Sequence, residues 1–289
     1  MPVEPPIETP RSLAEAYAAL SESTAEAQIT PIAGGTDLMV RITGEIGAPP
    51  ERLIDLWRLD DLRGIAVDGP AISLGALTTY MDIRRSAACR EHLPILVEAA
   101  ATIGAAQIQN RGTLGGNIAN ASPAGDTLPV LLALDAEIVV GSARGERSIA
   151  AADFWTTYRQ TALAPDELIL RVRIPLAGDR EAHFRKIGTR RAQAISKVVL
   201  ALAWGDGGPS TRWRDVRLAL GSVADRPIRA PRTEAVLEGS APTPEAADAA
   251  AEALAAEINP IDDVRSSADY RRTVAARVVH RIVRDAGGW

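Results

Sequence analysis

Cysteine is almost absent from this 289-residue chain, which contains only Cys89. A single thiol cannot form an internal disulfide, a thiolate zinc site or an iron–sulfur cluster held by the chain itself. The three histidines are scattered without the spacing of metal ligands, so we expect no metal site. Because so few thiols occur, we expect a cytoplasmic protein.

Common functional motifs are missing as well. The chain has no Walker A pattern, no G-x-G-x-x-G and no G-x-S-x-G, so a standard nucleotide-binding motif or a serine nucleophile is not indicated. A net charge of -5 disfavours nucleic acid as a partner. No apolar run is long enough for a membrane span, and the first residues lack the features of a signal peptide.

Aromatic residues are scarce, at 4% of the chain. Few side chains are therefore available to stack on a planar ligand, and the candidates are Tyr80, Tyr158 and Phe184. No histidine, cysteine or tyrosine is placed where it suggests a nucleophile or a general base. We therefore predict no catalytic residue in this chain.

A glycine-dense segment over residues 112–126 is the most informative feature that is present. It has few charges and little helical periodicity, and short polar side chains flank Gly115 and Gly116. Glycine allows positive φ and close approach of a ligand to the main chain. Successive N–H groups in such turns bind phosphates. The density of hydrogen-bonding residues exceeds what a hairpin turn needs.

A shorter segment, residues 33–37 (Ala-Gly-Gly-Thr-Asp), repeats this chemistry upstream. It follows a predicted strand and precedes a predicted helix, a position that suits phosphate binding. Alone, it is equally typical of a tight strand-to-helix turn without a ligand. The two segments together favour one diphosphate held from two sides.

The hydrophobic patterns divide the chain into three stretches. Residues 1–56 read as a small α/β unit, with a helix over 13–20, a strand over 29–33, a helix over 38–42 and a strand over 53–56. Residues 57–175 contain predicted strands over 71–75, 137–140 and 168–174 and predicted helices over 78–85 and 93–106. From residue 176 we expect helices over 190–203, from 244 and over 270–283, and a strand over 216–220.

Lys186 lies in a basic run, residues 183–191, with Lys197 close behind and no acidic residue between them. Read alone, this run is typical of a solvated basic face. It is also compatible with a cation placed beside a cofactor, or with a docking patch.

These segments resemble the FAD-binding medium subunit of the molybdenum hydroxylases, the carbon monoxide dehydrogenase and xanthine dehydrogenase type. The resemblance covers essentially the whole chain. It is carried by residues 33–37, by 102–104 and 110–126, and by 186–191 with 194–197. It implies an α+β fold: a two-part FAD-binding domain of the PCMH (vanillyl-alcohol oxidase-like) type over 1–175, with subdomains of about 1–56 and 57–175, and a smaller α+β domain over 176–289.

The resemblance also implies a cofactor site. The two glycine segments would hold the FAD pyrophosphate, Ile103 would pack near the nucleotide, and Asp126 would accept a polar contact. Ile169 would pack near the flavin, and Lys186 would lie near its polar edge, where a cation stabilises the charge of the reduced ring. The residues expected to bind the cofactor are Ile32, Ala33, Gly34, Gly35, Thr36, Asp37, Leu38, Thr102, Ile103, Gly112, Thr113, Leu114, Gly115, Gly116, Asn117, Ser122, Asp126, Ile169 and Lys186.

The implied function is electron transfer. FAD would accept electrons from the [2Fe–2S] clusters of a small partner subunit and pass them to an external acceptor, while a large partner subunit carries the molybdenum cofactor. A dimer of heterotrimers is the family expectation. One alternative is a self-sufficient FAD-dependent oxidoreductase on the same fold. Another is a cofactor-free assembly protein, which would require eroded glycine loops.

Overall fold

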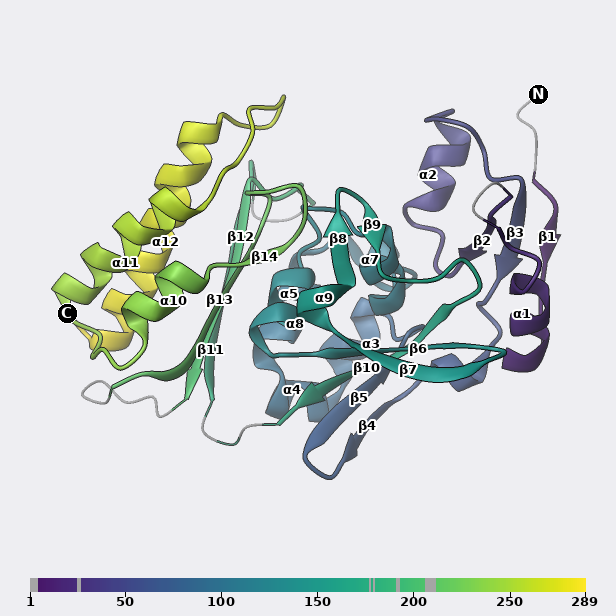
Figure 1. Cartoon of the computed structure of the whole chain (residues 1–289), viewed down its shortest axis with the longest axis horizontal. Coiled ribbons are helices and arrows are strands. Elements are labelled where there is room, and N and C mark those ends of the chain that lie inside the picture. The colour runs from purple at the N-terminus through teal and green to yellow at the C-terminus, as the bar shows by residue number, and fades with distance from the viewer. Residues whose placement is uncertain (1–4, 25–26, 177, 179, 191–192, 206–211) are drawn as a thin grey trace.

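The computed structural model describes residues 5–24, 27–176, 178, 180–190, 193–205 and 212–289. In these residues, the strands form a three-stranded, a five-stranded and a four-stranded sheet and a two-stranded hairpin (Figure 1). The basic run predicted over residues 183–191 is described only as far as Arg190, because residue 191 lies outside these ranges.

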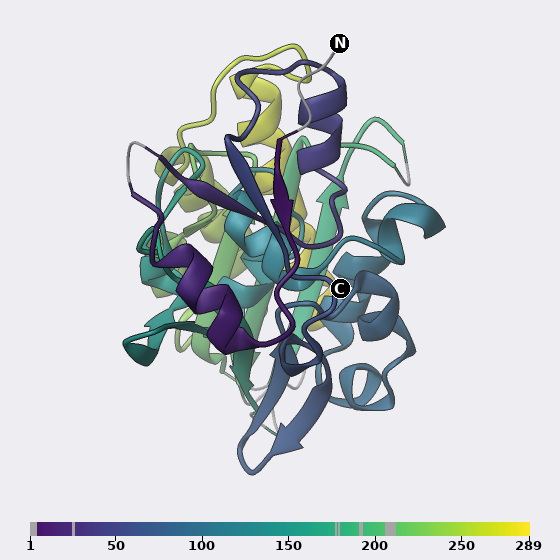
Figure 2. The ribbon, with the colours of Figure 1, turned by 90° about the vertical axis from the view of Figure 1, so that its right-hand side faces the viewer.

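The first unit is a parallel sheet of β1 (Ile7–Glu8), β3 (Arg52–Asp55) and β2 (Ile29–Ile32), in that order. Helix α1 (Leu13–Leu20) begins at Ser12, whose hydroxyl accepts from the Glu15 N–H. Helix α2 (Leu38–Thr43) follows β2 and buries none of its residues. Figure 2 looks onto this unit, whose strands cross in front of the rest of the chain. The α/β pattern expected for residues 1–56 is therefore present.

The second unit is an antiparallel sheet in the order β4-β5-β10-β6-β7. Its strands are β4 (Ile65–Asp68), β5 (Ala71–Gly75), β10 (Leu168–Pro175), β6 (Glu137–Ser142) and β7 (Gly145–Ala150). A hairpin of β8 (Trp155–Thr157) and β9 (Gln160–Thr161) lies apart from that sheet. The short helices are η1 (Asp60–Leu62), α3 (Tyr80–Arg85), α4 (Ala87–His92), α5 (Pro94–Thr102), α6 (Ala106–Gln109), α7 (Leu114–Asn120), α8 (Leu128–Ala133) and α9 (Ala151–Phe154).

The helix expected over residues 93–106 is interrupted. Helix α5 ends at Thr102, and α6 begins only at Ala106. Gly104 between them has a φ of 54°, a left-handed conformation that cannot continue an α-helix. The glycine-dense segment also differs from expectation. Its sequence has little helical periodicity, yet Leu114–Asn120 is a helix in the structure. Thr113 caps this helix, accepting from the Gly116 N–H at 3.0 Å.

The third unit is an antiparallel sheet of β11 (Glu181–Ile187), β12 (Val198–Gly205), β13 (Arg214–Gly221) and β14 (Ile228–Arg229). Helices α10 (Pro231–Leu237), α11 (Pro244–Glu257) and α12 (Ala268–Gly287) cover one face, while α5 and α8 meet the other (Figure 1). The sheet therefore joins two cores, one shared with the preceding unit and one of its own.

The helix predicted over residues 190–203 is wrong over its described second half, where β12 lies instead. Along β12, Val199 and Ala201 enter the core shared with the second unit, while Leu200 and Leu202 enter the core beneath the helices. A strand buried on both faces is apolar at every position. A continuous apolar run of this kind cannot be told from a buried helix by its periodicity.

Glu257, at the end of α11, caps the start of α10. Its carboxylate accepts from the N–H groups of Arg232 and Thr233 at 2.9 Å each and from the Thr233 hydroxyl at 2.8 Å. We expect Glu257→Ala to lower the free energy of unfolding by about 2 kcal/mol, because hydrogen bonds to a charged acceptor are lost together. Urea unfolding measures this, with Glu252→Ala on the exposed face of α11 as the control. Equal stabilities of the two variants would contradict the capping role.

Candidate functional site

A cavity of about 970 Å³ lies where the first unit meets the second. Its walls come from the β2–α2 segment, from α7 and from the stretch between β8 and β10. These parts are far apart in the sequence, so the cavity exists only in the folded chain. Segments within residues 28–38, 41–50, 113–120 and 159–169 supply most of the lining.

The turn after β2 presents unpaired main-chain donors to this cavity. Among the described residues, no acceptor is in place for the N–H groups of Gly34 to Leu38, five in succession. The carbonyl of Gly35 accepts from the Met39 N–H at 2.9 Å, which starts α2. Gly35 has a φ of 74°, a left-handed conformation, and all five residues line the cavity. Such a concave row of donors binds an anion.

The segment after Arg111 works differently. The N–H of Leu114 donates to the Thr78 carbonyl and that of Gly115 to the Ala76 carbonyl, both at 2.9 Å. The N–H groups of Gly116 and Asn117 donate to Thr113. The N–H groups of this segment are therefore already hydrogen-bonded within the protein. The segment lines the cavity but offers it no row of free donors.

The two glycine segments touch each other at Gly34. A Cβ atom built on Gly34 would lie 1.7 Å from the carbonyl oxygen of Arg111, so no other residue fits there. Gly115 is confined in a similar way, because its Cβ would lie 2.7 Å from that of Ala76. Close main-chain packing, rather than flexibility, requires glycine at both positions.

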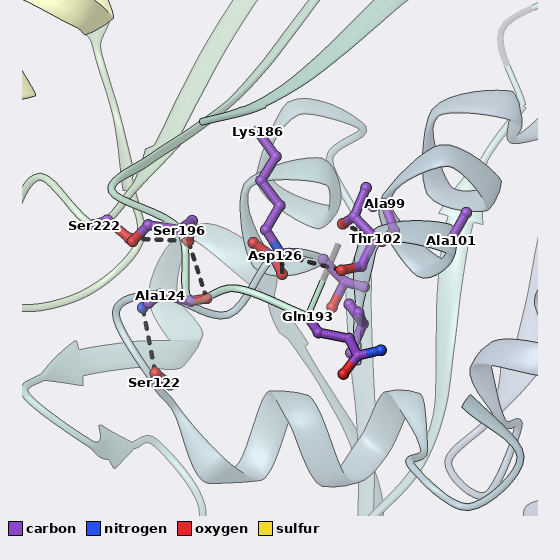
Figure 3. A network of polar contacts seen from close by, with 12 residues as sticks. Ala99, Ala101, Thr102, Ser122, Ala124, Asp126, Lys186, Gln193, Ser196 and Ser222 are labelled. Carbon is purple, nitrogen blue, oxygen red and sulfur yellow. Dashed lines mark hydrogen bonds and ion pairs between the residues drawn. The ribbon is translucent and has the colours of Figure 1, made fainter. Parts of the chain in front are cut away.

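A buried ion pair lies outside the cavity lining, between the second and third units (Figure 3). Lys186 of β11 donates to Asp126 Oδ2 at 2.6 Å and to the Thr102 carbonyl at 3.2 Å. The side chains of Lys186 and Asp126 are only 7% and 9% exposed. Burial raises the pKa of Asp126 above its ordinary value, and the charge of Lys186 opposes that change. Asp126 Oδ1 is buried and has no hydrogen-bond partner among the described residues.

Many of the residues expected to bind the cofactor line this cavity. They are Ile32, Ala33, Gly34, Gly35, Thr36, Asp37, Leu38, Thr113, Gly115, Gly116, Asn117 and Ile169. The rest lie outside its lining: Thr102, Ile103, Gly112, Leu114, Ser122, Asp126 and Lys186. Among these, Lys186 donates to both Thr102 and Asp126, and Ser122 accepts from the Ala124 N–H in the turn before Asp126.

Two arginines of the cavity wall were not expected from the sequence. Arg41 lies on α2, and Arg159 lies in the β8–β9 turn with a φ of 54°. Arg159 donates to the Asn120 side-chain oxygen at 2.8 Å. No local signal marks an arginine in a turn as part of a distant cavity, because only the tertiary fold brings it there.

Of the aromatic candidates, Tyr80 lines the cavity, whereas Tyr158 and Phe184 do not. Burial raises the pKa of Tyr80 far above its ordinary value, so its phenol stays protonated. Glu167 also lines the cavity, and hydrogen bonds from Arg147 at 2.7 Å lower its pKa. Neither group is suited to accept a proton from a ligand near neutral pH.

In the ranges that the structure describes, no three His, Cys, Asp or Glu side chains gather where they could hold a metal ion. Within those ranges, too, none of the helices has the length and apolar character needed to cross a membrane. Cys89 is buried.

Comparison with known proteins gives concordant matches. Residues 3–177 match the FAD binding domain in molybdopterin dehydrogenase, and residues 183–286 match the CO dehydrogenase flavoprotein C-terminal domain. The chain is 35% identical to the nicotine 6-hydroxylase medium subunit of Paenarthrobacter nicotinovorans, over 89% of each chain. It is 32% identical to the carbon monoxide dehydrogenase medium chain of Hydrogenophaga pseudoflava, over 96% of this chain and 95% of the relative.

The fold is similar as well. A solved structure of carbon monoxide dehydrogenase from Hydrogenophaga pseudoflava, which lacks the Mo-pyranopterin moiety, superimposes with a TM-score of 0.91 at 32% identity. The similarity covers 97% of this chain and 96% of that one.

Proposed function

This chain belongs to the family of FAD-binding medium subunits of the molybdenum hydroxylases, and on that premise we propose that it carries electrons between partner subunits and an external acceptor. The observation that best supports this proposal is the row of unpaired N–H groups over Gly34–Leu38 beside a cavity of about 970 Å³. A dinucleotide cofactor brings two adjacent negative phosphates, the charge that such a row binds.

The residues fit FAD in two further ways. Gly34 leaves no space for a side chain where it packs on Arg111 and Gly112, and Gly115 leaves none where it packs on Ala76, so main chain forms the cavity wall at both positions. Asp126 Oδ1 is buried and receives no hydrogen bond from the described residues, because the nearby Ser196 hydroxyl, which opposes the rise that burial causes in the pKa of this carboxyl, is directed to Ala124 and Ser222. A ligand that donates to Oδ1 would pair this acceptor. We propose that the pyrophosphate lies against Gly34–Leu38 and Thr113–Asn117, and that Asp126 accepts from a hydroxyl or N–H of the cofactor.

FAD supplies the redox chemistry when bound, since it exchanges electrons both singly and in pairs. The chain's own contribution is to bind and orient the cofactor and to set the charge around it. A self-sufficient oxidoreductase would need an acid or base over the flavin, and among the described residues that line the cavity there is no histidine or cysteine for that role. The glycine segments are intact, which disfavours a cofactor-free assembly protein.

We propose two partners, a large subunit with the molybdenum cofactor and a small subunit with [2Fe–2S] clusters, assembled as a dimer of heterotrimers in the cytoplasm. The single cysteine, Cys89, cannot hold a cluster, so the clusters must come from another chain. We also propose that the chain divides near residue 175 into an FAD-binding domain and a C-terminal domain. Strand β10 ends at Pro175, and β11 begins at Glu181.

The test is an absorption spectrum of the chain expressed alone, followed by analysis of the nucleotide that heat releases. We expect the visible bands of oxidised flavin and intact FAD in the supernatant. A colourless protein that also refuses added FAD would contradict the proposal. Mixing the yellow protein with a reduced iron–sulfur partner should bleach it rapidly, whereas the organic substrate alone should not.

A further inference from the structure

Trp57 is held between two arginines at the boundary of the first and second units. The guanidinium carbon of Arg111 lies 3.8 Å from the centre of the indole ring, and that of Arg63 lies 4.6 Å from it. Arg63 also donates to the Trp57 carbonyl at 2.6 Å. Cations over an indole face are attracted by its quadrupole, so the ring links the two side chains.

The backbone ties Trp57 to the wall of the cavity that carries the free donors. Its N–H donates to the Asp55 carboxylate at 2.9 Å, at the end of β3. The preceding Leu56 donates from its N–H to the Ile32 carbonyl at 2.9 Å. Ile32 lies two residues before Gly34, so the ring is fixed relative to the turn that presents the N–H groups.

Arg111 directly precedes the second glycine segment, outside the cavity lining. Its carbonyl oxygen is the atom packed against Gly34, and the next residue, Gly112, accepts from the Tyr80 N–H at 3.2 Å. The main chain of Arg111 therefore touches one glycine segment while leading into the other. Its side chain returns across the boundary to Trp57.

The Arg111 side chain has no other visible use in this part of the molecule. It forms no ion pair with a described carboxylate, and Arg111 does not line the cavity. A direct contact with a bound phosphate and a surface ion pair are therefore both disfavoured. The contact that the structure does show for this side chain is the one with the Trp57 ring.

We infer that Trp57 is a positioning residue, which through Arg111 fixes the spacing of the two glycine segments and thereby slows FAD release. This inference rests on the proposed function, because it needs FAD in the cavity between these segments. Trp57 does not touch the cavity itself, so its effect is transmitted by Arg111.

The test measures the rate at which the purified full-length protein releases FAD, followed by the fluorescence of the freed flavin. Because Arg111 is exposed, its contact with the ring is a weak one. We expect Trp57→Ala to release FAD about threefold faster, while Trp57→Phe, which keeps an aromatic face, stays within about 1.5-fold of the wild type. Arg111→Met should match Trp57→Ala. Trp289→Ala, which removes a tryptophan at the far end of the chain, is the matched control and should have no effect.

A double-mutant cycle separates this role from general destabilisation. If the ring acts through Arg111, the double variant Trp57→Ala/Arg111→Met should release FAD no faster than either single variant. Multiplying effects, or a wild-type rate in Trp57→Ala, would overturn the inference. Urea unfolding of the apo proteins identifies a variant that has simply lost its fold, and Arg111→Met then serves in place of Trp57→Ala.

A different result would contradict the proposed function itself. If Gly35→Val still binds FAD, the cofactor site itself is wrong. If Gly35→Val loses FAD while both Trp57→Ala and Arg111→Met keep it at the wild-type rate, only the positioning role of Trp57 falls.

Discussion

Replacing Gly35 with valine is expected to reduce FAD affinity by at least about 100-fold while leaving the protein folded. Gly35 has a φ of 74°, where a β-branched residue is a genuine outlier. Holding an L-residue in that conformation costs about 1–2 kcal/mol. A Cβ there would also lie 3.1 Å from Met39 Cγ. Relief of this strain turns the N–H groups of the turn away from the cavity, and the pyrophosphate loses its donors.

Gly239→Val is the matched control for this variant. Gly239 has nearly the same φ, 72°, and its Cβ would meet nothing within 4 Å. It lies in the third unit, outside the cavity lining. Both variants pay for the same backbone strain, so a difference between them reports the site. Titration of the apo proteins with FAD gives the affinities, and thermal melting checks the fold. Equal affinities would contradict a role for this turn.

Replacing Lys186 with methionine is expected to lower the free energy of unfolding by about 3–5 kcal/mol near neutral pH. Both partners of the Lys186–Asp126 pair are nearly inaccessible to water. Without the Lys186 ammonium group, the buried carboxylate of Asp126 has no positive charge beside it. Asp126 must then be ionised at a large desolvation cost, or be protonated.

The pH dependence of this loss has a definite sign. Burial already raises the pKa of Asp126 in the wild type, and removing Lys186 removes the opposing influence. Because the folded-state pKa lies above the unfolded one, stability is retained at low pH and lost as the pH rises through the folded-state pKa. The deficit of Lys186→Met should therefore be larger at about pH 8 than at about pH 5.

Urea unfolding of Lys186→Met and of the double variant Asp126→Asn/Lys186→Met tests this interpretation at both pH values. The double variant has no buried charge at this position, so it should recover a large part of the stability and lose the extra pH dependence. A deficit in Lys186→Met that is the same at both pH values would show that the carboxylate is not the group responsible.

Local chemistry let the sequence predict several elements correctly. Ser12 before an amphipathic stretch predicted the start of α1, and Thr243–Pro244 predicted the start of α11. The glycines near residues 34 and 115 marked two segments that line the cavity and pack tightly on neighbouring main chain or side chains. These signals can be read from the sequence because caps and positive φ depend on a residue and its immediate neighbours.

Other features could not be predicted in this way. The apolar run of β12 is a strand because two cores need one layer between them. The N–H groups of Leu114 and Gly115 donate to the carbonyls of Thr78 and Ala76, which lie in the segment directly after β5. Lys186 reads as part of a solvated basic run until the third unit packs on α5 and α8.

By itself, then, the sequence determined the local units, the two glycine segments and the family resemblance. Only the tertiary structure decided that the first segment keeps its donors free while the second uses its own, that Arg159 reaches the cavity, and that Arg111 packs on the Trp57 ring. The reason is physical. A free N–H, a buried charge or a stacked ring is defined by what surrounds it, and those surroundings come from residues distant in the chain.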